Sequence, residues 1–103
     1  MLLDPPRITV PPARTSRVDA GQNLTLTCNA SGDPRPNITW TREGATQANQ
    51  LVNATGNRLY LVNVQKKDVG SYRCTAQNGY GTANSLALVN VKCKYSHTLH
   101  FYI

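Results

Sequence analysis

The feature that most constrains this chain is an ordered set of four residues: Cys28, Trp40, Tyr72 and Cys74. Cys28 closes a run in which apolar and polar residues alternate, and Tyr72 stands two positions before Cys74. Alternation with a period of two, with the apolar residues on one side, predicts a strand that is buried on one face. Each residue alone is a weak signal, but their order and spacing together constrain the fold strongly.

These residues resemble the signature of the immunoglobulin superfamily, and the resemblance to its I-set branch covers roughly Pro6 to Val91. It implies an all-β, immunoglobulin-like β-sandwich with Greek-key topology, in which a Cys28–Cys74 disulfide joins two antiparallel sheets. A metal site or redox pair is disfavoured because neither cysteine belongs to a Cys-x-x-Cys motif. A bridge that closes a loop of this span is worth about 4 kcal/mol in the loop-entropy model.

The resemblance also assigns roles to the residues around the bridge. Trp40 is expected to pack on the disulfide, and the Tyr72 hydroxyl to bond to the backbone of the corner between the fifth and sixth family strands. Asp68 lies in that corner, and Gly70 is expected to allow a close backbone turn there.

The 103 residues are expected to form one domain over 6–92, after a linker or added start at 1–5. Residues 93–103 match nothing in the family and are expected to be a disordered or non-native tail. Pro11 and Pro12 interrupt the first strand, at the point where such strands cross between sheets in I-set domains. The segment between Cys28 and Cys74 leaves no room for the extra edge-strand pair of variable domains. Strands are predicted at 7–10, 13–18, 23–30, 37–42, 50–52, 58–64, 71–77 and 82–91.

Two further expectations concern turns. Residues 31–36 are expected to form a loop, and Asn78-Gly79 marks the tip of a hairpin. The apolar phase of the last strand slips between Leu88 and Val89, which suggests a bulge or a twist.

Four Asn-x-Ser/Thr triplets without proline indicate a secretory origin, because each is an acceptor for N-linked glycan. The expected disulfide agrees, since disulfides persist outside the cytosol. We therefore expect a glycoprotein that is secreted or belongs to a membrane-anchored parent. The candidate glycosylation sites are Asn23, Asn29, Asn37 and Asn53.

Catalysis needs a nucleophile with a base held beside it, and the sequence assembles no such pair. The only histidines, His97 and His100, lie in the tail, and the acidic residues are scattered. The tail also lacks an acidic residue or a second cysteine for zinc beside Cys93. The sequence therefore predicts no enzyme, no metal and no cofactor. No apolar run is long enough to cross a bilayer, so no direct membrane insertion is expected.

Cys93 is the odd cysteine of the chain. In a secreted protein a leftover thiol suggests an intermolecular bridge or a partner in a missing segment. Truncation or a cloning accident is the alternative explanation.

Eleven Lys and Arg residues stand against five Asp and Glu residues. A basic surface favours acidic partners such as heparan sulfate. The nearest clusters, Lys66 with Lys67 and Lys92 with Lys94, have only two residues each, which is weak evidence. No nucleic-acid motif occurs, and the basic residues are scattered along the chain.

Surface recognition is the remaining function. We expect an extracellular protein-recognition module of a cell-adhesion molecule or a cell-surface receptor, which binds another surface or secreted protein, possibly itself, without covalent bonds. The alternative is a structural spacer domain with no ligand, including the intracellular muscle type. The possible binding face comprises Thr41, Arg73, Thr75 and Gln77, with Tyr80 at the adjoining loop tip. Asn37 argues against this face, because a glycan on Asn37 would lie on it.

Overall fold

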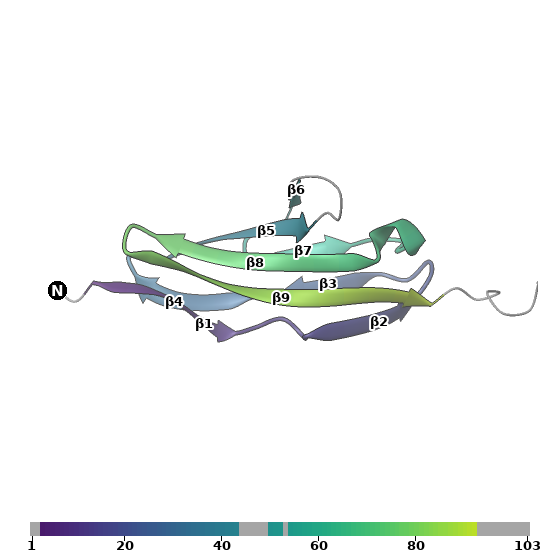
Figure 1. The fold of residues 1–103 in the computed structure, drawn as a ribbon, viewed down its shortest axis with the longest axis horizontal. Coiled ribbons are helices and arrows are strands. Elements are labelled where there is room, and N and C mark those ends of the chain that lie inside the picture. Colours follow the sequence, from purple (N-terminus) through teal and green to yellow (C-terminus); the bar gives the residue numbers. More distant parts are fainter. Residues whose placement is uncertain (1–2, 44–49, 53, 93–103) are drawn as a thin grey trace, which may run out of the picture.

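The computed structural model describes residues 3–43, 50–52 and 54–92, and these residues form two layers of β-strands (Figure 1). The first strand begins at one end of the molecule and the last strand ends at the other. A single short 3₁₀ helix, η1 (Lys66–Asp68), interrupts the strands of the described residues. The all-β prediction is confirmed.

One layer is a five-stranded sheet with β9 (Gly81–Lys92) and β8 (Gly70–Asn78) at its centre. The neighbouring strands are antiparallel except for β2 and β9, which run parallel, so this sheet is mixed rather than purely antiparallel. The predicted strand at 50–52 is present as its edge. The full order of the sheet is β2 (Thr15–Asp19), β9, β8, β5 (Asn37–Glu43) and β6 (Gln50–Val52).

The other layer contains two strand pairs, β1 with β4 and β3 with β7, all antiparallel. The parallel pair in the first sheet has its origin here, because the chain leaves β1 and joins the opposite sheet as β2. Pro11 and Pro12 lie at the crossing, where they lack the amide donors that a ladder needs. The predicted break of the first strand is confirmed. The strands of this layer are β1 (Asp4–Val10), β3 (Leu24–Thr27), β4 (Asn29–Asp33) and β7 (Arg58–Leu61).

Several strand boundaries differ from the predictions, and the strand predicted at 23–30 is divided at Cys28 into β3 and β4, which pair with different strands. β1 begins at Asp4, inside the segment expected to be a linker, and Asp4 pairs with Asp33. This pairing carries β4 through most of the expected loop at 31–36. β7 ends before Asn63, whose positive φ of 52° breaks the extended backbone. Val64 is nevertheless fully buried, and its amide donates a hydrogen bond to the Gln22 carbonyl at 2.9 Å.

The core lies between the layers, around the Cys28–Cys74 disulfide, whose Cα atoms are 6.5 Å apart. Trp40 and Leu59 are fully buried in the same cluster. Burying a side chain of the size of leucine stabilises the fold by about 1.5–3 kcal/mol. The inward residues of β8 are those that the alternation predicts: Tyr72, Cys74 and Ala76.

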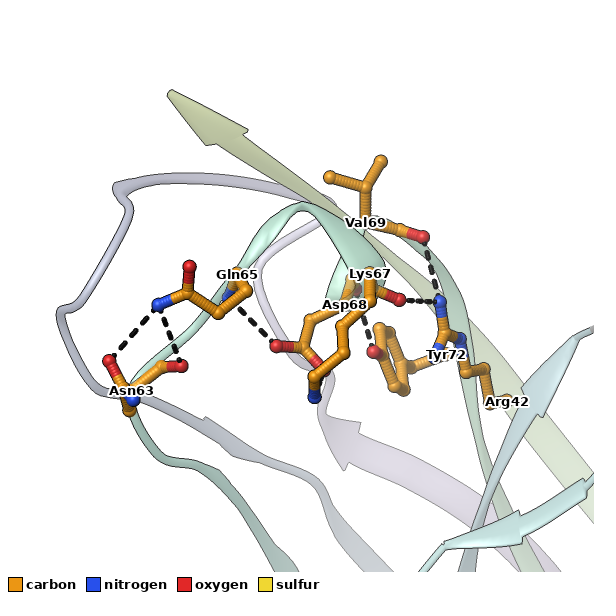
Figure 2. A network of polar contacts seen from close by, with 7 residues as sticks. All are labelled: Arg42, Asn63, Gln65, Lys67, Asp68, Val69 and Tyr72. Atoms are coloured by element: carbon orange, nitrogen blue, oxygen red, sulfur yellow. Dashed lines mark hydrogen bonds and ion pairs between the residues drawn. The ribbon is translucent and has the colours of Figure 1, made fainter. Parts of the chain in front are cut away.

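The Tyr72 hydroxyl donates a 2.7 Å hydrogen bond to the Asp68 carbonyl, as the resemblance implies (Figure 2). The Asp68 carboxylate in turn accepts the Gln65 amide at 2.8 Å, which closes the turn of η1. Gly70 follows with φ of 158°, which side chains rarely adopt. Burial raises the pKa of the Tyr72 hydroxyl. Hydrogen bonds from Gln65, which precedes η1, and from Tyr72, which follows it, therefore hold the corner in place.

Arg42 braces the same corner from β5 (Figure 2). Its guanidinium donates to the carbonyl oxygens of Lys67 and Val69, the latter at 3.1 Å, and lies 5.7 Å from the centre of the Tyr72 ring. A guanidinium above an aromatic face adds a cation–π attraction. The sequence did not indicate this brace, which joins segments about 25 residues apart.

The hairpin tip is confirmed, with Gly79 and Tyr80 as its loop between the paired residues Asn78 and Gly81. The Asn78 side chain accepts the Tyr80 amide at 2.8 Å and donates to the carbonyls of Asp4 and Pro34, both at 2.8 Å. One asparagine thus joins the hairpin, the first strand and the loop after β4.

Of the two explanations given for the phase slip in the last strand, a bulge or a twist, the bulge is wrong. β9 pairs with β8 without a register shift, from Gly81 to Val89. Ala87 and Val89 point into the core, while Leu86 and Leu88 are exposed. The apolar alternation shifts at Leu88 only if Leu86 and Leu88 are both assigned to the core together with Val89. Here the strand keeps its period of two and places its largest aliphatic residues outside.

Candidate protein-binding face

The candidate site is the outer surface of the sheet formed by β5, β8 and β9. The register sets Trp40 opposite Cys74, and both side chains are fully buried. The next position along each strand therefore points outward. This parity places Thr41 and Arg73 side by side, with Leu86 next to Arg73 on β9.

Predicted site residues from two strands are brought together on this surface. Thr41 and Arg73 are partners in the ladder, and Thr75 and Gln77 follow on the same face of β8. We call the central part of this surface the Arg73 face. It comprises Thr41, Glu43, Arg73, Thr75, Leu86 and Leu88.

Arg73 is held in a fixed orientation by its neighbours. Its Nε donates to Glu43 Oε2 at 2.7 Å, and its Nη1 donates to the Asn84 side-chain oxygen. The hydrogen bond from Arg73 lowers the pKa of the Glu43 carboxyl and raises the pKa of the guanidinium. Both side chains are about a third exposed or less, and such partly exposed pairs add little stability. The geometry presents a guanidinium with a preset direction.

Leu86 and Leu88 are the residues that sequence reasoning missed. They are 41% and 46% exposed and lie beside Arg73 and Ser71, respectively, in the β8–β9 ladder. The available signal was the regular alternation of small and larger residues from Ala83 to Val89. Exposed apolar residues also occur in and after β7, where Tyr60 is 48% and Val62 is 70% exposed, so it is the position of the two leucines beside Arg73 that marks them.

Tyr80 does not belong to this group. It is 53% exposed, but it sits at the hairpin tip, where Pro5 of the first strand approaches Gly81. Leu86 lies six positions after Tyr80 (86 − 80), which corresponds to about 20 Å along a strand. Tyr80 therefore lies at the end of the molecule rather than on the Arg73 face.

Asn37 lies on the same outer surface, directly opposite Gln77. Both residues are exposed and line an open hollow at the hairpin end of the sheet. A glycan on Asn37 would cover Gln77. The Arg73 face begins at the next outward position of β8, Thr75, and extends from there toward the other end of the sheet.

The other described glycan acceptors occupy the second layer. Asn23 is exposed, and its side-chain oxygen accepts the Asn63 amide at 2.9 Å. Asn29 is half-buried, and its oxygen accepts the Asn57 side-chain amide. Both bonds use the oxygen, so that Nδ2 is the atom left to carry a sugar. Asn53, Lys94, Cys93, the two histidines and the rest of the predicted tail lie outside the described residues.

The two predicted basic clusters are each accompanied by an acid. Lys67 forms a 3.4 Å ion pair with Asp68, and Lys92 stands opposite Asp19 in the β2–β9 ladder. These neighbours offset part of the positive charge that heparan sulfate would need.

Within the described part of the chain, no group of three or more His, Cys, Asp or Glu side chains is placed to hold a metal ion. The same residues include no helix that is long and apolar enough to cross a membrane.

Comparison with known protein families gives a match over residues 5–78, to the family described as "Immunoglobulin domain". Human hemicentin-1 is 39% identical over 83 residues, which cover 79% of this chain and 2% of hemicentin-1. The chicken cell adhesion molecule DSCAM is 36% identical over 85 residues, which cover 73% of this chain and 4% of DSCAM. This chain thus spans a small part of the length of these relatives.

A similar solved structure is a complex of titin M10 with an obscurin-like 1 immunoglobulin domain. One chain of this F17R mutant complex superposes with a TM-score of 0.75 at 28% identity, and the alignment covers 89% of this chain and 97% of that one. The similarities therefore include both adhesion proteins and titin.

Proposed function

Because this chain is a member of the immunoglobulin domain family, we propose that it is an extracellular protein-recognition module that binds through the Arg73 face. The observation that carries the proposal is the exposure of Leu86 and Leu88 beside an oriented guanidinium. Immunoglobulin relatives that are cell-adhesion proteins support a protein partner. We propose no enzymatic role.

The chemistry of the Arg73 face suits a protein partner. Burying exposed leucine surface yields about 25 cal/mol per Å². Thr41 and Thr75 are short side chains, which let a partner approach the leucines closely. Arginine is enriched at binding hot spots, and the Glu43 contact sets the orientation of Arg73 before binding.

Three features support an extracellular setting. The Cys28–Cys74 disulfide is stable in oxidising compartments. The acceptor asparagines Asn23 and Asn37 are exposed on opposite layers. DSCAM is a cell adhesion molecule by name. The division of the first strand between the two sheets supports the I-set branch. Because β1 begins at Asp4, the proposed domain starts at residue 4 rather than 6 and runs to 92, with a tail at 93–103.

A second candidate function is a structural spacer, including an intracellular role of the muscle type. The similarity to titin favours it. A spacer would leave the Arg73 face without a ligand. Secretion from animal cells distinguishes the two settings, with the intact mass determined before and after glycan removal and the free thiols counted. Occupied glycan sites and an oxidised Cys28–Cys74 pair support the ectodomain. A bare chain with three free thiols supports the spacer.

The binding role is tested by screening the secreted chain against animal cells and cell-surface proteins. A chain with Leu88→Asp should bind at least about tenfold more weakly, because a buried carboxylate without a partner is costly. Tyr60→Asp is the matched control, since Tyr60 is 48% exposed on the other layer. Equal binding by the two variants contradicts the assignment of the Arg73 face.

A further inference from the structure

We propose that an N-linked glycan on Asn23 packs against Tyr60 and Val62 and covers these apolar side chains. We call the two side chains the Val62 patch. The inference rests on the extracellular setting of the proposed function, because N-linked glycans are added in the secretory pathway. It concerns the layer opposite the Arg73 face and explains why large apolar residues stay exposed there.

The Val62 patch faces away from the core because its neighbours along the chain face inward. Leu59 is fully buried, and Leu61 packs against the core cluster. Strand alternation therefore turns Tyr60 and Val62 outward. Val62 is the most exposed large apolar side chain among the described residues, at 70%. Two large apolar residues that stay exposed together form a candidate contact surface.

The β3–β7 ladder places Asn23 next to Val62. At this end of the ladder Leu24 pairs with Leu61. Asn23 and Val62 are the next residues beyond that pair, and both are exposed. The Asn63 amide donates to Asn23 Oδ1 at 2.9 Å, so the two segments stay in contact here. Side chains directly opposite each other on one face of a sheet have Cβ atoms about 4.5–5.5 Å apart. A group attached to Asn23 therefore begins beside Val62.

Tyr60 lies diagonally across the ladder from Asn23. It pairs with Thr25, which is two positions further along the chain than Asn23 and on the same face of the sheet. Diagonal neighbours of this kind are about 7–8 Å apart, which long and aromatic side chains can span. A sugar on Asn23 can thus reach the Tyr60 ring and the Val62 methyl groups together.

The Asn23 side chain leaves the correct atom for a glycan. Its Oδ1 accepts the Asn63 amide, whereas the sugar attaches to Nδ2. Attachment forms a bond from Nδ2 to the anomeric carbon of the first sugar. One amide proton is lost, and the isoprenoid diphosphate that carries the oligosaccharide departs. Because the hydrogen bond to Asn63 uses Oδ1, it can remain after attachment and orient the first sugar.

The first sugar of an N-linked glycan, an N-acetylglucosamine, suits the Val62 patch chemically. One side of its ring presents C–H groups, which can pack on the Tyr60 ring and the Val62 methyl groups and remove apolar surface from water. Its hydroxyl groups stay in water at the outer side. A protein partner is a weaker explanation of this patch, because it would have to approach beside the glycan on Asn23.

The exposed leucines of the Arg73 face have no acceptor beside them in the ladder. Leu86 pairs with Arg73 and Leu88 pairs with Ser71, and neither partner can carry an N-linked glycan. The glycan on Asn23 therefore closes the apolar part of one layer to protein contact, while Leu86 and Leu88 stay open on the other.

The experiment measures the reactivity of individual tyrosines in the full chain secreted from animal cells. Peptide mass spectrometry gives the glycan occupancy of Asn23, and tetranitromethane then nitrates accessible tyrosine rings. We expect an occupied Asn23 and a Tyr60 that reacts several-fold faster after Asn23→Gln. Tyr80 is the internal control, since it is 53% exposed at the hairpin tip and should react at the same rate in both chains. Asn37→Gln, on the other layer, should leave the rate at Tyr60 unchanged.

A second measurement needs no substitution. An endoglycosidase that leaves only the first sugar on each asparagine should keep Tyr60 protected, because the first sugar is the one beside the Val62 patch. In this trimmed chain, nuclear Overhauser contacts should join protons of the sugar on Asn23 to the Val62 methyl groups.

The outcomes separate this inference from the proposed function. A secreted chain with a bare Asn23 overturns the inference. So does an occupied Asn23 with no effect of Asn23→Gln on Tyr60, or a trimmed sugar without contacts to Val62. These results leave the Arg73 face standing, because its own test is the binding of Leu88→Asp. A bare chain with three free thiols overturns the extracellular setting as well.

Discussion

The residues of β8 point alternately into the core and toward solvent, and these two sets of residues have different roles. Tyr72 and Cys74 point inward and are buried, whereas Arg73 and Thr75 point outward beside β5 and β9. The inner side holds the layers together through the disulfide and the corner. The outer side is poorly buried and stabilises the fold little. The comparison teaches that one strand can fix the fold with every second residue and leave the others free for recognition.

The largest expected effect lies at the disulfide. Cys74→Ser should lower the free energy of unfolding by about 4 kcal/mol, because the unfolded chain regains the freedom of a long loop. Denaturant unfolding monitored by Trp40 fluorescence measures the change. An unchanged unfolding midpoint contradicts the role of the bridge on the inner side.

The same substitution on the two sides gives the sharpest contrast. Leu59→Ala should cost about 3 kcal/mol, because Leu59 is fully buried and its truncation leaves a cavity. Leu88→Ala should change the stability by no more than about 0.5 kcal/mol, because Leu88 is 46% exposed. Thermal and denaturant unfolding of both variants test the comparison. A similar loss of unfolding free energy at Leu59 and at Leu88 would contradict the distinction between buried and outer residues.

The corner contributes a smaller share. Tyr72→Phe should cost about 1 kcal/mol, because the Asp68 carbonyl loses its 2.7 Å hydrogen bond. Tyr60→Phe is the matched control at an exposed tyrosine and should be neutral. If Tyr72→Phe and Tyr60→Phe have the same free energy of unfolding, the Tyr72 hydrogen bond does not stabilise the corner.

The smallest effect is the pH dependence of the outer ion pair. Arg73 lowers the pKa of Glu43 in the folded state, so the pair stabilises the fold above the ordinary carboxylate pKa of 4.5. This contribution is lost as the pH falls through the lowered folded value. The difference in stability between wild type and Glu43→Gln should therefore shrink in acid. A difference that grows in acid contradicts the assigned contact.

The sequence predicted the inner side well, because each clue there was local. Alternation placed Tyr72 and Cys74 inward, and two prolines predicted where the first strand crosses between sheets. The extension of β4 was not predictable, since it depends on the pairing of Asp33 with Asp4, which lies 29 positions earlier in the sequence (33 − 4). The brace from Arg42 likewise joins distant segments.

The outer side was predicted only in part. Thr41, Arg73, Thr75 and Gln77 were assigned correctly to one face, because strand alternation suffices for that. Leu86 and Leu88 were missed because leucine is usually buried, so that a core position was expected for both. Their pairing with outward residues of β8 places them on the outer side. Whether the face binds a protein, and which protein, is a matter of chemistry between molecules, on which one sequence carries no direct signal.

The most direct test of the central claim compares the outer side of the sheet with the opposite layer in one binding experiment. The secreted chain, its Leu86→Asp/Leu88→Asp variant and its Tyr60→Asp variant are titrated onto cells, with melting temperatures measured in parallel. The account predicts equal melting temperatures, a loss of binding of at least about tenfold for the double variant, and no loss for Tyr60→Asp. Binding by the double variant that equals that of the wild type would contradict the account.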